Sequence, residues 1–135
     1  MLFRSELQAL FDSRDLDIAS LEEGVLDNAS YFGRIFARSG GLTDAAVQAM
    51  KEQNIDFAIK PVVCDGIEAC RMALLKLNKS PAALGGNFIE GMACIGGCIG
   101  GAGCLTHGEK NKAEVDKYGR EALEKNISDA VSLLK

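Results

Sequence analysis

The 135-residue chain is predicted to form a small α/β domain, in which helices flank a mainly parallel sheet. Short runs of branched and aromatic residues alternate with segments whose apolar residues recur at helical spacing. That alternation is typical of parallel strands joined by helical crossovers. In addition, no linker or internal repeat divides the sequence, so residues 1–135 are expected to be a single domain.

The order of the expected elements follows from capping signals and from the period of the apolar residues. Capping boxes at Ser5-x-x-Gln8 and Ser20-x-x-Glu23 each predict the start of a helix. A Ser39-Gly40-Gly41 turn is expected to join a strand to the helix that follows it. The expected elements are helices over residues 5–12, 20–26, 43–53 and 67–77, strands over 31–37, 56–63 and 87–92, and a long terminal helix over 115–134.

Composition excludes several classes of protein. The formal net charge of -4 and the scattered lysines are unlike the clustered basic stripe of a nucleic-acid-binding surface. The first residues lack the pattern of a signal peptide, and no apolar run reaches the length of a membrane helix. Five cysteines, an odd number, favour metal-binding or reactive thiols over a disulfide framework. A cytoplasmic location, with no membrane or nucleic-acid partner, is therefore expected.

The most informative stretch runs from residue 87 to residue 107 and contains three cysteines among six glycines. Glycine allows the backbone to approach a bulky ligand closely, and thiolates are natural ligands of soft iron and zinc centres. The strand over 87–92 delivers Cys94 just beyond its carboxyl end, where open α/β sheets place their ligands. Cys98 follows one helical turn later, but no second cysteine pair typical of zinc sites follows. The glycines also fit neither phosphate-binding pattern, so an iron-sulfur site is the preferred interpretation.

At these residues the sequence resembles a known family. The pattern Glu90-x-Met92-Ala93-Cys94-x-x-Gly97-Cys98-x-x-Gly101 resembles the last of three cysteine motifs in the large subunit of FeFe (iron-only) hydrogenases. The run Ala37-Arg38-Ser39-Gly40-Gly41 is similar to a Gly-Gly turn that opens a helix in the same family. The resemblance implies the C-terminal lobe of a two-lobed catalytic domain, without the upstream part that carries motifs of the Thr-Ser-Cys-Cys-Pro and Met-Pro-Cys types.

The resemblance also implies roles for individual residues. Cys94 would ligate one iron of a 4Fe-4S cubane, and Cys98 would bridge that cubane to a two-iron subsite carrying carbon monoxide and cyanide, the composite called the H-cluster. Met92 would pack over the two-iron subsite, with an ordinary core thioether as the alternative. Glu90 would support the site from the surrounding protein, although a solvated carboxylate at the strand end is the favoured alternative. The N–H groups of four glycines are candidate hydrogen-bond donors to the cluster: Gly96, Gly97, Gly100 and Gly101.

The remaining cysteines and the single histidine have weaker assignments. Cys70 lies on the apolar stripe of its helix and is expected to be buried. Cys64, at the end of a strand, could be a neighbour of the site or a redox-sensitive thiol. Cys104 stands where the family usually has a small residue. His107 could carry protons, with a surface position near a helix start as the favoured alternative.

The expected parent protein is a hydrogenase that interconverts protons, electrons and H2, and whose partner is a ferredoxin-like electron carrier. This chain would supply two of four cluster thiolates and would be inactive without the missing N-terminal region. One alternative is a non-catalytic iron-sulfur assembly protein or a hydrogen-sensing relative. Another is a metal-free α/β interaction module whose open sheet edge pairs with a second copy, forming a homodimer.

Overall fold

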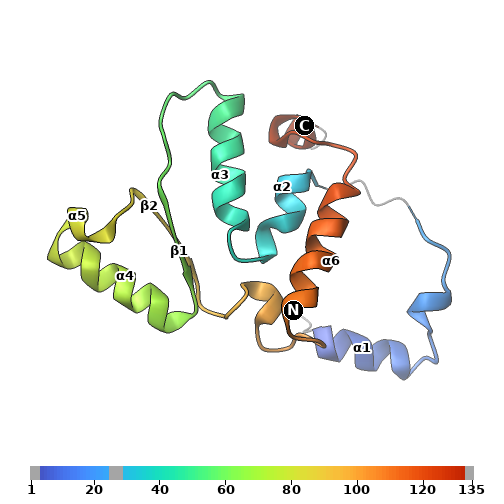
Figure 1. Cartoon of the computed structure of the whole chain (residues 1–135). Coiled ribbons are helices and arrows are strands. Elements are labelled where there is room, and N and C mark those ends of the chain that lie inside the picture. The colour runs from blue at the N-terminus through green and yellow to red at the C-terminus, as the bar shows by residue number, and fades with distance from the viewer. Residues whose placement is uncertain (1–3, 25–28, 133–135) are drawn as a thin grey trace.

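The computed structural model describes residues 4–24 and 29–132, in which a small sheet lies toward one end of the molecule, between α4 and α3 (Figure 1). The helices are α1 (Arg4–Asp12), α2 (Tyr31–Arg34), α3 (Gly41–Glu52), α4 (Ile67–Lys79), α5 (Pro81–Leu84), α6 (Glu109–Arg120) and α7 (Ile127–Ser132). The strands are β1 (Pro61–Asp65) and β2 (Phe88–Met92), and three 3-10 turns lie at η1 (Ile18–Ser20), η2 (Ile35–Ala37) and η3 (Cys98–Gly100).

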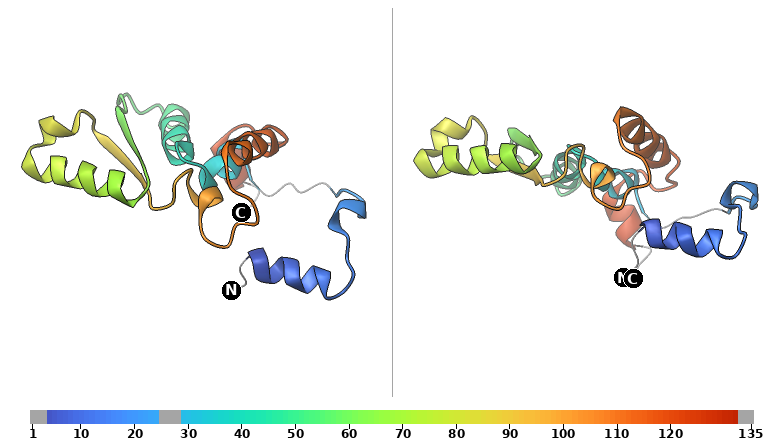
Figure 2. Two further views of the ribbon diagram at one scale, coloured as in Figure 1. Left: turned by 60° about the horizontal axis from the view of Figure 1, so that its bottom comes forward. Right: turned by 90° about the horizontal axis from the view of Figure 1, so that it is seen from below.

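The sheet confirms the predicted α/β class. Strands β1 and β2 run parallel, with Pro61 opposite Phe88 and Asp65 opposite Met92, and α4 forms the crossover between them. Cys64 of β1 is buried, and a Cβ on Gly91 of β2 would lie 3.3 Å from the Cys70 sulfur of α4. Figures 1 and 2 show this β1–α4–β2 unit on one side of α3, with α2, α6 and α7 on the other.

The helical side packs around Ile35, which is fully buried. Helix α6 reaches it through Gly119, where an added Cβ would lie 2.7 Å from the Ile35 side chain. The Arg34 guanidinium stacks over the Tyr118 ring at 4.5 Å, an arrangement that favours a cation beside an aromatic face. These contacts hold α6 against α2. The chain segment that joins the cysteines to α6 is therefore anchored where α6 begins.

Two expected elements are wrong. Residues 31–37 form α2 and η2 instead of a strand, because the buried Ser30 side chain caps the turn by accepting a hydrogen bond from the Gly33 N–H at 3.2 Å. The described sheet accordingly has two strands instead of three. The long terminal helix is broken between Arg120 and Ile127 around the buried Ala122.

The second capping box also fails in the residues that can be compared. Asp17 caps η1 through the Ala19 N–H, and the chain is extended at Leu21, where a helix is expected. Leu26 and Leu134, the last expected residues of two helices, lie outside the described residues. Among the residues that are described, no helix is long and apolar enough to cross a bilayer.

Glu52, the last residue of α3, caps the start of α7. Its carboxylate accepts hydrogen bonds from the Ser128 hydroxyl at 2.7 Å, the Ile127 N–H at 2.9 Å and the Ser128 N–H at 2.8 Å. These bonds lower the pKa of Glu52 from 4.5 to about 2. Because they favour the charged form, they attach α7 to α3 most strongly while Glu52 is ionised.

This cap predicts a pH-dependent contribution to stability. Since the folded pKa of Glu52 lies below its unfolded value, the contribution is complete above about pH 4.5 and disappears as the pH falls through about 2. Glu52→Gln should therefore lower the thermal midpoint at pH 7, and the gap to the wild type should narrow at pH 3 and close near pH 2. Circular dichroism melts measure this, and a gap that stays constant with pH would contradict the assignment.

Candidate functional site

The cysteine loop, defined as residues 93–108, joins β2 to α6. It opens with consecutive tight turns, in which the Gly97 N–H bonds to the Cys94 carbonyl at 3.0 Å and the Gly100 N–H to the Gly97 carbonyl at 3.0 Å. The Gly101 N–H then bonds to the Cys98 carbonyl at 3.1 Å. Gly97 has a φ of +88°, in the left-handed region that glycine adopts readily. The glycine-rich sequence thus folds the loop back on itself.

Both predicted ligands lie in these turns. Cys94 is half-buried and Cys98 is exposed. The Cys94 sulfur and the Cys98 carbonyl oxygen each lie 3.2 Å from the place that a Cβ on Gly101 would occupy. The absence of a side chain at position 101 therefore lets the Cys94 thiol pack against the turn that carries Cys98.

The four predicted glycine donors all have acceptors within the protein. The Gly96 N–H bonds to the Asp65 carboxylate at 2.7 Å, and those of Gly97, Gly100 and Gly101 bond to carbonyls of the loop. Donation from these amides to a cluster stays a prediction. It would require the loop to exchange or share its present hydrogen-bond partners.

Glu90 lies at 0% exposure, so the expectation of a solvated strand-end carboxylate is wrong. It accepts hydrogen bonds from the Gly40 N–H at 2.7 Å, from the Thr43 N–H at 2.8 Å and from the Thr43 hydroxyl. These groups belong to the first turn of α3, whose cap residue Gly40 offers no side-chain acceptor. A helix that begins with Gly-Gly is the sequence signal that could have indicated a cap from elsewhere in the chain.

Arg38 is a buried residue that sequence reasoning missed. Its guanidinium bonds to Asp116 of α6 at 2.6 Å and to Asp44 of α3 at 3.0 Å, while its backbone forms an antiparallel bridge with Gly97. Burial alone would lower the pKa of Arg38, but the hydrogen bonds to the two aspartates outweigh burial and raise it. Arg38 thus stays charged and joins two helices to the cysteine loop.

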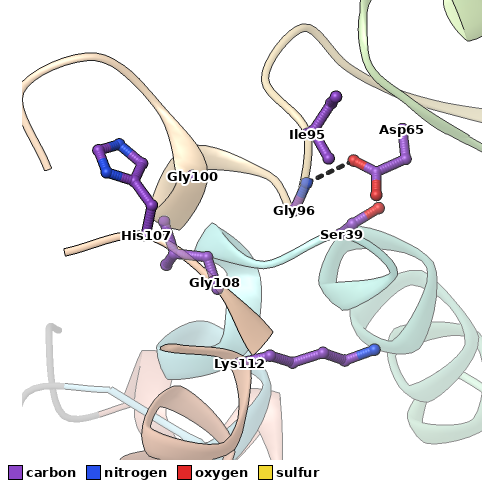
Figure 3. A pocket seen from close by; sticks show the side chains of 9 residues that line it. Ser39, Asp65, Ile95, Gly96, Gly100, His107, Gly108 and Lys112 are labelled. Atoms are coloured by element: carbon purple, nitrogen blue, oxygen red, sulfur yellow. Dashed lines mark hydrogen bonds between the residues drawn. The ribbon is translucent and has the colours of Figure 1, made fainter. Parts of the chain in front are cut away.

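A recess of about 450 Å³ opens beside the loop (Figure 3). Its walls include Asp65, His107 and Lys112, and the Asp65–Gly96 hydrogen bond lies along one of them. Backbone of the cysteine loop lines the recess, but neither Cys94 nor Cys98 does. The recess is therefore distinct from the thiol positions.

The comparisons with known proteins bear on this loop directly. Residues 1–102 match the family described as iron only hydrogenase large subunit, C-terminal domain. The chain belongs to this family. A search of curated proteins found no match. The matched part of the hydrogenase domain contains both strands, Cys94 and Cys98, and it confirms the resemblance seen in the sequence.

Membership of the hydrogenase family implies iron-sulfur and H-cluster cofactors in full-length proteins. Thiols are suitable donors for iron, and the absence of a Cβ at Gly101 leaves Cys94 and Cys98 in neighbouring turns. Within the described residues, however, no group of three or more His, Cys, Asp or Glu side chains could hold a metal ion. The thiols of Cys94 and Cys98 fit as members of an iron-sulfur ligand set.

The other thiols of the hydrogenase chain have protein contacts. Cys64 is buried, and burial, followed by its proximity to Cys70, raises the pKa of its thiol, which disfavours a reactive thiolate. Cys70 is only half-buried, and its sulfur lies 3.6 Å from the Met92 carbonyl. Cys104 donates to the Cys98 carbonyl at 3.2 Å and accepts from Arg4 at 3.4 Å.

Two candidates remain, Met92 and His107. Met92 is half-buried at the end of β2, and its carbonyl accepts the Gly66 N–H at 2.8 Å. His107 is exposed, with its Nε2 atom 3.3 Å from the Gly101 carbonyl. Packing of Met92 over a two-iron subsite and proton transfer by His107 both stay predictions.

A methyl group at position 100 should disrupt the cysteine loop. A Cβ on Gly100 would lie 1.9 Å from the Ile95 carbonyl oxygen, so Gly100→Ala must displace backbone and should cost roughly 1–3 kcal/mol of stability. Gly24→Ala is the control, because no atom lies within 4 Å of the Cβ it would add. Thermal unfolding of both variants measures the difference, and equal midpoints would contradict the loop geometry.

Proposed function

We propose that the chain forms the C-terminal lobe of an iron-only hydrogenase catalytic domain and that Cys94 and Cys98 supply two of the four thiolates that hold the H-cluster. The observation that carries this proposal is the packing of the Cys94 sulfur over Gly101, next to the turn that presents the exposed Cys98. The family match to residues 1–102 supports the choice of cofactor.

When bound, the H-cluster supplies the redox chemistry that interconverts protons, electrons and H2. The protein residues position it. Cys94 is held against the loop and would provide a fixed attachment, whereas Cys98 faces outward, where a sulfur can bridge toward a larger group. Gly101 keeps the space beside the Cys94 sulfur free of a side chain.

The proposal includes an upstream hydrogenase region as the source of the other two thiolates and a ferredoxin-like protein as electron carrier. The chain supplies only two of the four thiolates in this proposal, so the isolated chain should be inactive. The cytoplasm suits this role because its reducing environment keeps thiols free. A non-catalytic assembly protein or a hydrogen-sensing relative would use the same two ligands, and activity of the complete protein distinguishes these cases.

One observation favours a second candidate, a metal-free module that pairs with another copy of itself. In the described residues the sheet has only β1 and β2, so each strand has one unpaired edge. Helix α4 also exposes large apolar side chains, with Ile67 68% and Leu74 58% exposed. The upstream hydrogenase region would cover the same surfaces, and light scattering of the isolated chain tests for a dimer.

The ligand assignment predicts the outcome of anaerobic reconstitution with iron and sulfide. The chain should take up iron and give a paramagnetic resonance signal on reduction, while Cys94→Ala and Cys98→Ala should lose most of both, because each removes one of only two ligands. Cys70→Ala is the matched control, since Cys70 is also half-buried but lies on α4. Equal iron content in all variants would refute the assignment.

The chain alone should evolve no H2 from reduced viologen, even after reconstitution. Two thiolates cannot complete the ligand set that the family implies, and the solvent-exposed Cys98 leaves one side of the site open to water. Gas chromatography of the headspace measures this, with buffer containing the same iron and sulfide as the blank. Evolution above that blank would contradict the proposed dependence on the upstream region.

A further inference from the structure

We propose that Glu90 is a positioning residue for Cys94, because its buried carboxylate attaches the end of β2 to the first turn of α3 and thereby holds the Cys94 thiol in place for cluster binding. The inference rests on the proposed role of Cys94 as a ligand, and it adds the group that orients that ligand. Glu90 acts through the backbone and touches no reacting atom.

The first step is the chemistry of the Glu90 environment. A fully buried carboxylate is tolerated only when hydrogen bonds replace its hydration. Here two backbone N–H groups and one hydroxyl do so, and all three belong to Gly40 and Thr43. The positive end of α3 adds further stabilisation of the negative charge. The attachment therefore needs a side chain at position 90 that can accept all three hydrogen bonds.

The second step is that the same turn also holds the chain beyond Cys94. We call residues 38–43 the turn segment. The Ser39 N–H bonds to the Gly96 carbonyl at 3.1 Å, and Arg38 forms its bridge with Gly97. The approach is so close that a Cβ on Gly97 would lie 2.7 Å from the Ser39 nitrogen. The turn segment is thus bonded to the chain on both sides of Cys94, at Glu90 before it and at Gly96–Gly97 after it.

The third step is that the turn segment has a firm base. The Arg38 side chain joins it to α6 through Asp116 and to α3 through Asp44. Gly41 packs so tightly that an added Cβ would lie 2.1 Å from the Ile35 carbonyl oxygen. Ile35 is the centre of the helical core. Glu90 therefore fixes the position of Cys94 relative to that core.

The test measures thiol reactivity residue by residue in the metal-free chain. Alkylation by iodoacetamide, followed by mass spectrometry, reports the rate at each cysteine separately. Glu90→Gln keeps the shape of the side chain but removes its charge. It should speed alkylation of the half-buried Cys94 by about tenfold, since a hydrogen bond to a charged group shifts a local opening equilibrium by at least that factor. The exposed Cys98 should change little.

Glu52→Gln is the matched control. Glu52 also caps a helix by accepting from two N–H groups and one hydroxyl, but these belong to Ile127 and Ser128 of α7 and not to the turn segment. A second pair of variants guards against misfolding: Thr43→Val removes the buried hydroxyl and should speed alkylation of Cys94, whereas Thr43→Ser retains the hydroxyl and should not. A general loss of stability would instead raise the alkylation rate of Cys94 in all of these variants.

Reconstitution of the same variants separates this inference from the proposed function. Glu90→Gln should lower the iron content and broaden the resonance signal, whereas Glu52→Gln should leave both unchanged. The inference is overturned if Glu90→Gln and Thr43→Val leave the Cys94 rate at the wild-type value, or if Glu52→Gln raises it equally. Normal iron content in Cys94→Ala would instead refute the ligand assignment, with the alkylation result standing on its own.

Discussion

The arrangement of this chain depends on the hydrogen bonds that the buried Glu90 carboxylate accepts. The β1–α4–β2 unit and the helices around Ile35 meet at the start of α3, where this carboxylate accepts three hydrogen bonds. An unpaired carboxylate would be expelled from such a position. The amides at a helix start have no acceptors inside the helix. The carboxylate therefore supplies acceptors to these amides, and the amides supply donors to the carboxylate.

Two helices of the chain are capped by a carboxylate from another element, and the two carboxylates differ in their exposure to solvent. Glu90 belongs to a strand and caps α3 from the interior, whereas Glu52 belongs to α3 and caps α7. Helix α3 therefore receives a carboxylate at its first turn and provides one from its last residue. This succession of caps links β2, α3 and α7 without a continuous sheet, which suits a chain whose described sheet has only two strands.

Much of the fold near the cysteines could be predicted from the sequence, because the signals there are local. The apolar residues Phe88, Ile89 and Met92 before Cys94 indicate β2, and the spacing of Cys70 and its neighbours indicates α4. Residues 31–37 were harder, since their aromatic and branched side chains favour a strand while Ser30 starts a helix. The break between α6 and α7 falls around the buried Ala122, and periodicity alone does not reveal it. Glu90 and Arg38 could not be assigned, because their partners lie up to 78 residues away along the chain.

The two polar attachments of the turn segment differ in their sensitivity to salt. The Glu90 carboxylate is shielded from solvent and bonded to dipoles, so dissolved ions have no access to compete with its partners. Arg38 is paired with Asp44, whose side chain is 48% exposed, and at physiological ionic strength charges in water are screened over about 8 Å. Concentrated salt would thus weaken the ion pair between Arg38 and α3 well before it weakened the hydrogen bonds between Glu90 of β2 and α3. A protein built this way would keep β2, the strand that leads to Cys94, in place even in concentrated salt.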